Sequence, residues 1–271
     1  MNHTLESSFP LKVELAETNT VFSRLTAWSG LEGNPQQVYI ENFGNAKAFI
    51  VKGIPDPYFN SVRGLTSEDM DQLDNIIEFY HDHKVSCRFD IPPSVNPDLL
   101  LKLAERGYYQ SGFHSSLYRF TNKELSIPGS DDGIEVRQIE DSEFNYFGEI
   151  YTKAFTMPDF LASAVTANNL VLKDRPGWQF YLATDNHVPA AVAVLYVQDG
   201  MASLAAAATL PAFQGRGYHS ALLAARINEA RKLECDLVVG QARFGSASEG
   251  NMKRFGLQLA YTKSIWKEMP K

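Results

Sequence analysis

Three strand-like segments in the second half of the sequence limit most strongly how this chain can fold. Residues 178–184, 190–198 and 202–209 are rich in aromatic and branched side chains, and short Asp-, Asn- and Gly-containing turns separate them. Apolar segments joined by such turns predict an antiparallel meander. A glycine-rich loop and an Ala-, Leu-, Arg- and Lys-rich stretch from about Gly217 to Leu233 come next, which predicts a long helix.

The remaining segments also alternate between strand and helix patterns. In the second half we expect strands at 134–138, 236–240 and 257–267, and helices at 141–155, 158–170 and 246–255. In the first half we expect strands at 37–41, 46–52, 58–65, 86–91 and 113–120, and helices at 11–29, after Thr66 or Ser67, and after Asn96. This order predicts the α+β class, with mostly antiparallel sheets flanked by helices.

A polar segment at residues 122–133, NKELSIPGSDDG, has the composition of a linker. A chain of 271 residues exceeds the usual size of one domain, so we expect domains at 1–125 and 133–271. Ala104–Arg119 and Met252–Lys267 share a pattern of helix, glycine stop and strand. Any helix-to-strand hairpin with a glycine cap looks similar, but the matching element order of the two halves favours a duplicated unit.

Composition and charge argue against several classes of protein. The net charge of -7 argues against a nucleic-acid partner, which needs a clustered excess of Lys and Arg. No run of apolar residues is long enough to span a membrane, and the first residues do not resemble a secretory signal. The two cysteines, Cys87 and Cys235, have no metal-ligand spacing. We therefore expect a cytoplasmic protein without a membrane partner or a metal.

The strongest chemical signal is the loop Gln214–Ser220, which lies between an apolar strand and the long helix. Its glycines allow backbone amides to turn toward a ligand, and the helix N-terminus adds unpaired N–H donors, so the loop suits a diphosphate. A dinucleotide-binding fold fits less well, because Ser220 stands at the third glycine position and too few strands follow. A Walker loop is excluded because no Lys-Ser or Lys-Thr follows the glycines.

At this loop the sequence resembles the GNAT superfamily of N-acetyltransferases, whose signature is Gln or Arg, two variable residues, Gly, one variable residue, then Gly or Ala. Gln214 and Gly217 match, and His219 stands at the last position. The strand before the loop, the Ser-rich start of a short helix at 246–251 and Gly256-Leu257 occur in family order. The first half has a similar element order without the loop, so it resembles a degenerate copy in a tandem protein.

The resemblance implies acetyl-CoA as the acyl donor and no metal. Backbone groups of Ala207, Ala208 and Thr209 would bind the pantetheine arm. The pyrophosphate would lie on amides of the loop, and Asn251 would also contact the cofactor. The loop positions implied by the resemblance are Gln214, Gly215, Arg216, Gly217, Tyr218 and His219.

The implied reaction is acetyl transfer to a primary amine, on a small molecule or a protein, by direct attack on the thioester. The catalytic residues are not identified, because Met252 stands at the position of the usual tyrosine and residues 201–209 contain no carboxylate. Tyr196, His219, Glu249 and Tyr261 are the nearest acid or base candidates in sequence. A non-catalytic CoA-binding sensor or scaffold, or a transferase for a longer acyl-CoA, remains an alternative.

Overall fold

The computed structural model describes residues 9–54, 56–122, 125–126 and 133–270. The chain forms two compact units. Unit 1 comprises Met1–Ser116, Ala242–Phe244 and Leu259–Lys271, and unit 2 comprises Leu117–Gln241 and Gly245–Gln258. Each unit contains its own hydrophobic core. Neither unit is a continuous stretch of sequence, because the last strand of each half belongs partly to the other unit.

Unit 1 combines a short mixed sheet with three helices from the described residues. The strands are β1 (Val38–Phe43), β2 (Ala46–Val51), β3 (Ser61–Arg63), β4 (Arg88–Ile91), the start of β5 (Tyr108–Phe120) and most of β11 (Gln258–Glu268). The helices are α1 (Phe9–Ser29), α2 (Leu73–His83) and α3 (Pro97–Glu105). β3 runs parallel to β4, and β11 runs antiparallel to β4 with Trp266 opposite Phe89.

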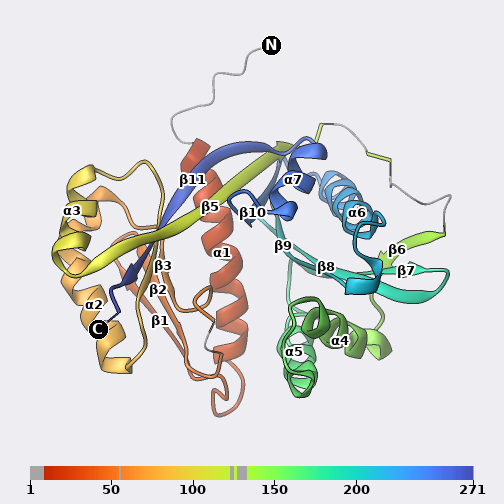
Figure 1. Cartoon of the computed structure of the whole chain (residues 1–271), viewed down its shortest axis with the longest axis horizontal. Helices are drawn as coiled ribbons and strands as arrows, with labels where there is room; N and C mark the ends of the chain where they lie inside the picture. The colour runs from red at the N-terminus through yellow and green to blue at the C-terminus, as the bar shows by residue number, and fades with distance from the viewer. Residues whose placement is uncertain (1–8, 55, 123–124, 127–132, 271) are drawn as a thin grey trace. The chain divides into compact units, whose positions relative to one another are not determined.

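Unit 2 contains the meander that the sequence predicted. Strands β6 (Ile134–Gln138), β7 (Trp178–Asp185), β8 (Val188–Gln198) and β9 (Met201–Thr209) pair antiparallel in that order. β10 (Leu237–Arg243) then pairs parallel to β9. Helix α6 (Tyr218–Lys232) covers one face of these strands, and α4 (Phe144–Ala154) and α5 (Ala162–Leu170) cover the other (Figure 1). Helix α7 (Ala247–Arg254) precedes β11.

Local sequence signals account for many of these boundaries, and the predicted α+β class is confirmed. Asn96 accepts a hydrogen bond from the amide of Asp98 and Pro97 opens α3, as predicted. Several boundaries differ from the prediction, and two of these differences have a clear local cause. β5 begins at Tyr108 rather than near Phe113, because Gly107 (φ +79°) turns the chain directly from α3 into the strand. The helix predicted from 141 begins as a 3-10 turn whose capping box joins Glu140 and Glu143.

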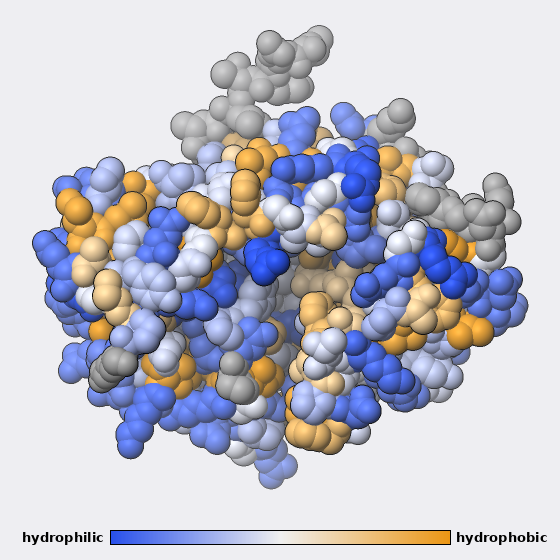
Figure 2. Space-filling model, viewed as in Figure 1, coloured by the Kyte–Doolittle hydropathy of each residue, from blue (hydrophilic) through white to orange (hydrophobic). Residues whose placement is uncertain are grey.

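The predicted linker lies partly outside the described residues, since 123–124 and 127–132 are not among them. Leu125 is held by Asn228 of α6, whose side chain accepts from the Leu125 amide at 2.8 Å and donates to its carbonyl at 2.7 Å. On the face of the molecule seen in Figure 2, hydrophobic side chains lie in small groups among hydrophilic ones. No helix within the described residues is both long and apolar enough to cross a membrane.

Gly148 allows α4 and α5 to pack closely. A Cβ at Gly148 would collide with Thr166 Oγ1 and the carbonyl oxygen of Ala162, both in α5. Gly250, also helical, has no neighbour closer than 3.7 Å to such a Cβ. The two glycines therefore offer a matched pair of substitutions with opposite expected effects.

We expect Gly148→Ala to lower the thermal midpoint of unfolding, because overpacking a close contact costs about 1–3 kcal/mol. Gly250→Ala should leave the midpoint unchanged or raise it slightly, since alanine favours the helix by roughly 0.5–1 kcal/mol over glycine. Calorimetry on both variants checks this, and equal midpoints for Gly148→Ala and the wild type would contradict the packing argument.

Candidate functional site

Two parallel strands of unit 2 separate partway along their length. β9 and β10 are paired only from Met201 opposite Leu237 to Leu204 opposite Gly240. β9 continues to Thr209 and β10 to Arg243. From Ala205 to Thr209, one edge of β9 remains paired with β8. No described strand pairs with the other edge of these residues. Alternate amides and carbonyls of Ala205–Thr209 are therefore available to an extended ligand that carries amide groups.

A bulge in β9 marks the point of separation. Val194 of β8 lies opposite Ala206, but the next residue, Leu195, lies opposite Leu204, so Ala205 has no partner. A bulged residue takes peptide groups out of the regular ladder and twists the strand. The bulge thus directs backbone groups away from β8 at the place where β10 no longer covers β9.

The loop after β9 exposes consecutive backbone amides. Gly215 (φ +76°) and Gly217 (φ +98°) have left-handed conformations that side chains rarely tolerate. Gly217 is the N-cap of α6, and no side chain caps this helix. Among the described residues nothing accepts a hydrogen bond from the amides of residues 215–220. A Cβ at Gly215 would meet open space, so this glycine is required by its conformation. The run of unpaired amides at a helix N-terminus favours an anion.

The side chains of the loop have structural partners. Gln214 Nε2 lies 3.5 Å from the carbonyl oxygen of Thr209, across the turn. Arg216 is half exposed and forms an ion pair with Asp185 at 2.8 Å. Tyr218 is buried and packs edge-on against Phe213. The positive charge of Arg216 remains near the loop, but in this conformation it is directed at Asp185.

The structure brings two predicted cofactor residues together at the start of α6. Asn251 Nδ2 of α7 lies 3.2 Å from His219 Nδ1. Burial, and secondarily Arg226 and Arg254, lowers the pKa of His219 to about 4. His219 is therefore a neutral imidazole near pH 7, and it adds no positive charge for an anion.

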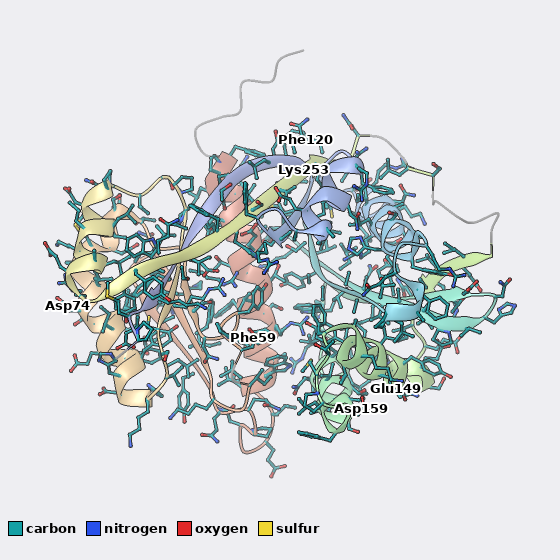
Figure 3. All side chains as sticks on the ribbon, viewed as in Figure 1. Phe59, Asp74, Phe120, Glu149, Asp159 and Lys253 are labelled. Atoms are coloured by element: carbon teal, nitrogen blue, oxygen red, sulfur yellow. The ribbon has the colours of Figure 1, made fainter. Side chains whose placement is uncertain are left out.

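The other candidate acids and bases are engaged elsewhere. Tyr196 donates to Gln198 at 2.8 Å and lies opposite Ser203, whereas the loop follows Thr209, which is opposite Ala191 at the far end of β8. Glu249 is buried, accepts from the amide of Gly245 at 2.5 Å and pairs with Lys253 of α7 at 2.6 Å. Figure 3 labels Lys253 on this helix. In unit 1, Tyr261 donates to Glu14 at 2.7 Å.

Met252, at the position of the usual family tyrosine, belongs to the core of unit 2. A Cβ on Gly240 would lie 2.9 Å from its sulfur, so Gly240 leaves room for Met252 to pack against β10. This position therefore contributes packing, and no described side chain replaces the missing tyrosine there.

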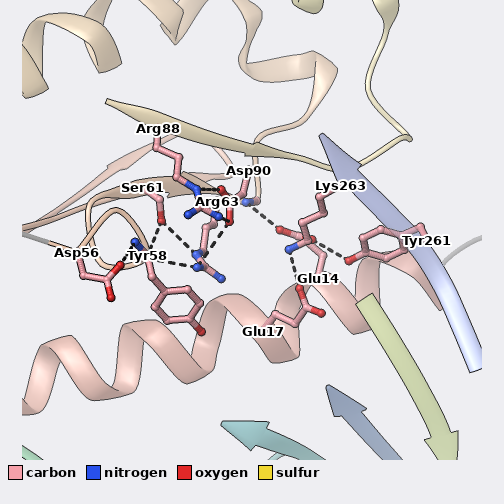
Figure 4. Close-up of polar contacts among 11 residues, drawn as sticks. Glu14, Glu17, Asp56, Tyr58, Ser61, Arg63, Arg88, Asp90, Tyr261 and Lys263 are labelled. Atoms are coloured by element: carbon pink, nitrogen blue, oxygen red, sulfur yellow. Dashed lines mark hydrogen bonds and ion pairs between the residues drawn. The ribbon is translucent and has the colours of Figure 1, made fainter. Parts of the chain in front are cut away.

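Unit 1 contains a buried cluster of charges that the sequence interpretation missed (Figure 4). Lys263 Nζ of β11 lies 2.7 Å from Glu14 and 2.6 Å from Glu17, both on α1. Arg63 of β3 faces Asp90 of β4 at 3.6 Å. All five side chains are at most 5% exposed. The available signals were two acidic residues on the apolar stripe of α1 and, in β11, a lysine that shares a strand face with Tyr261 and Ile265.

The cluster shifts the ionisation of its members. Burial, opposed by Lys263, raises the pKa of Glu17 to about 7. Burial would lower the pKa of Lys263, but Glu14 and Glu17 raise it above its ordinary value. Burial would likewise raise the pKa of Asp90, yet Arg63, Arg88 and Lys263 hold it below its usual range. Arg88 contributes an ion pair to Asp90 at 2.6 Å.

An antiparallel meander, a bulged strand that separates from its parallel neighbour and a glycine loop at a helix N-terminus together define a fold of the acyl-CoA transferase type. Residues 137–248 match the model of the acetyltransferase (GNAT) family. This match confirms, for residues 137–248, the resemblance to the GNAT superfamily found in the sequence. No curated protein matches the sequence.

Solved structures show a similar fold over almost the whole chain. A GCN5-related N-acetyltransferase from Kribbella flavida has 15% identity and a TM-score of 0.66, covering 92% of this chain and 96% of its own. One from Sphaerobacter thermophilus has 14% identity and a TM-score of 0.63, covering 93% of each chain. A tandem GNAT protein from the clavulanic acid biosynthesis pathway has 11% identity and a TM-score of 0.62, covering 94% and 96%.

The raised pKa of Glu17 predicts a pH-dependent effect of Glu17→Gln. Because the pKa of Glu17 is raised to about 7 in the folded protein, its carboxyl retains its proton up to about pH 7, whereas the unfolded carboxyl releases it near the ordinary pKa of 4.5. The free energy of unfolding of the wild type therefore falls as pH rises through this window, and that of Glu17→Gln lacks this decrease. We expect the melting temperature of Glu17→Gln, relative to the wild type, to increase between pH 5 and pH 8.

Glu78→Gln, which changes an exposed glutamate of α2, is the matched control, and its difference from the wild type should stay constant. A constant difference for Glu17→Gln as well would show that the buried carboxyl does not titrate in this range.

Proposed function

We propose that unit 2 is an N-acetyltransferase that transfers an acetyl group from acetyl-CoA to a primary amine. The observation that carries the proposal is the separation of β9 from β10 directly before a loop of unpaired amides. This arrangement offers an extended edge to the pantetheine arm and a positive helix terminus to the pyrophosphate, in the order in which CoA presents these groups.

The residues implied by the family resemblance fit this arrangement. Ala207, Ala208 and Thr209 lie in the stretch of β9 that β10 does not cover, and the backbone groups of this stretch that face away from β8 would pair with the amides of pantetheine. The amides from Gln214 to His219 would bind the pyrophosphate, and Arg216 would add a charge near it. Asn251, beside His219, would contact the cofactor from α7.

The chemistry requires a neutral amine beside the thioester carbonyl. The amine nitrogen forms a bond to the carbonyl carbon and the carbon–sulfur bond breaks. The proton lost by the amine is transferred through water to the departing thiolate, so that the products are the amide and free CoA thiol. Off-ladder amides near Ala205 would stabilise the negative charge on the carbonyl oxygen. Because Met252 and the strand 201–209 supply no acid or base, we assign most of the rate to positioning, which can supply about 7–11 kcal/mol.

We also propose that residues 1–125 and 133–271 are two related copies and that the first copy does not bind acyl-CoA. β3 and β4 of unit 1 are parallel, with Val62 opposite Phe89, and a helical segment connects them, as α6 connects β9 and β10. The amides that follow β3 already have partners within unit 1: Gly64 donates to Glu14 at 3.3 Å, and Thr66 donates to Asp69 at 2.8 Å.

Isothermal titration of acetyl-CoA tests the proposed site. We expect the wild type to bind and Gly217→Asp to lose binding by at least about 100-fold, because a carboxylate at the loop repels the pyrophosphate and the site needs a left-handed residue. Gly200→Asp is the matched control, because Gly200 (φ +71°) has the same backbone requirement in the β8–β9 turn at the other end of β9. It should bind normally.

If the wild type does not bind acetyl-CoA, the acetyltransferase proposal is wrong. If it binds, a panel of primary amines, including small amines and peptides with free N-termini or lysines, identifies the acceptor by release of the thiol. Binding without transfer to any acceptor would favour a CoA sensor. Faster turnover with longer acyl groups would identify a different donor.

The proposal for unit 1 predicts a stoichiometry of one. Titration of acetyl-CoA into the full chain should saturate at one molecule per chain, and Gly217→Asp should reduce this to zero. Two sites in the wild type, one of which persists in Gly217→Asp, would show that unit 1 retains a donor site.

A further inference from the structure

A buried arginine contacts the bulge in β9. Arg226 lies in the middle of α6 and is 1% exposed. Its Nε donates to the carbonyl of Leu222 within the helix at 3.0 Å. Its Nη1 donates to the carbonyls of Val194 and Ala206, each at 3.0 Å. These are the two residues that face each other immediately beside the bulged Ala205.

The charge of Arg226 has no carboxylate partner among the described residues. Among the described residues its hydrogen bonds go to carbonyl oxygens, and burial lowers its pKa to about 10. Removing a cation from water without an anion is costly, and a hydrophobic side chain would fill the same core position without that cost. The arginine therefore requires an explanation beyond packing.

The contact with Ala206 reaches one of the proposed donor-binding groups. The Ala206 carbonyl and the Ala207 N–H belong to one peptide unit, and the described chain has no cis peptide bond. In a trans peptide these groups point in opposite directions, so the Ala207 N–H points away from Arg226. A charge-assisted bond to the carbonyl polarises the peptide and strengthens the N–H as a donor.

We infer that Arg226 is a positioning residue for the thioester: it holds the bulge open and polarises the Ala206–Ala207 peptide toward the acyl group of the donor. The inference rests on the proposed acyl-CoA site in unit 2. The proposed role of Arg226 is not purely structural, because it concerns the acetyl end of the donor. The nucleotide end of the donor depends instead on the loop from Gln214 to His219.

The test compares free CoA with acetyl-CoA as probes on Arg226→Met and Arg226→Lys. Titration should show that both variants bind free CoA within about threefold of the wild type. Any preference of the wild type for acetyl-CoA over CoA should disappear in Arg226→Met and be partly retained in Arg226→Lys. Arg231→Met, which changes an exposed arginine of the same helix, is the matched control and should behave as the wild type.

Difference infrared spectroscopy of carbonyl-labelled acetyl-CoA provides a direct readout. The bound thioester carbonyl should vibrate at a lower frequency in the wild type than in Arg226→Met, with Arg226→Lys between them, because polarisation weakens the C=O bond. Near-ultraviolet circular dichroism establishes which variants are folded. If Arg226→Met is not folded, the comparison of Arg226→Lys with the wild type tests the inference.

Equal donor preference and equal carbonyl frequency in the wild type and in the folded variants would overturn the inference while leaving the acyl-CoA site intact. A wild type that binds neither CoA nor acetyl-CoA would instead overturn the proposed function on which the inference rests. The two failures are therefore distinguishable in one set of titrations.

Discussion

The pairing between β9 and β10 ends after Leu204 and Gly240, and every other feature of the candidate site depends on that limit. A continued ladder would occupy the edge of β9 and leave no backbone groups for an extended ligand. The bulge at Ala205, the arginine that binds its neighbours and the packing of Met252 on Gly240 all lie at this point. The glycine loop begins at Gln214, after five residues of open strand and the short turn at 210–213.

Corresponding backbone amides of the two units have different hydrogen-bond partners. After β9 the amides at the start of α6 have no partner in the part of the chain that the structure describes, whereas after β3 the carboxylates of Glu14 and Asp69 accept from Gly64 and Thr66. A carboxylate within the protein and a phosphate on a ligand satisfy the same donors. The buried charges of unit 1, with Lys263 between Glu14 and Glu17, thus stabilise one arrangement of the chain itself.

Features set by local sequence could be predicted, and features set by distant partners could not. The meander, the cap at Asn96 and the loop at Gly215 and Gly217 follow from turn chemistry, capping and backbone conformation, which act over a few residues. The role of Arg226 could not be read from a helix rich in arginine and lysine, because its carbonyl partners lie 20 and 32 residues away. The cluster around Lys263 joins α1 to β11 across almost the whole sequence, and the linker gave no sign that the compact units exchange strands.

The membership of β11 in unit 1 has a consequence for synthesis on the ribosome. Domains usually fold as they emerge, beginning with the N-terminal one. Here residues 259–271 complete the unit that begins with α1, and Lys263 is the cation beside Glu14 and Glu17. Until that residue leaves the exit tunnel, the first helix presents two carboxylates to a core that lacks their partner. Helix α1 therefore waits for a strand that is translated much later before the fold of unit 1 is complete.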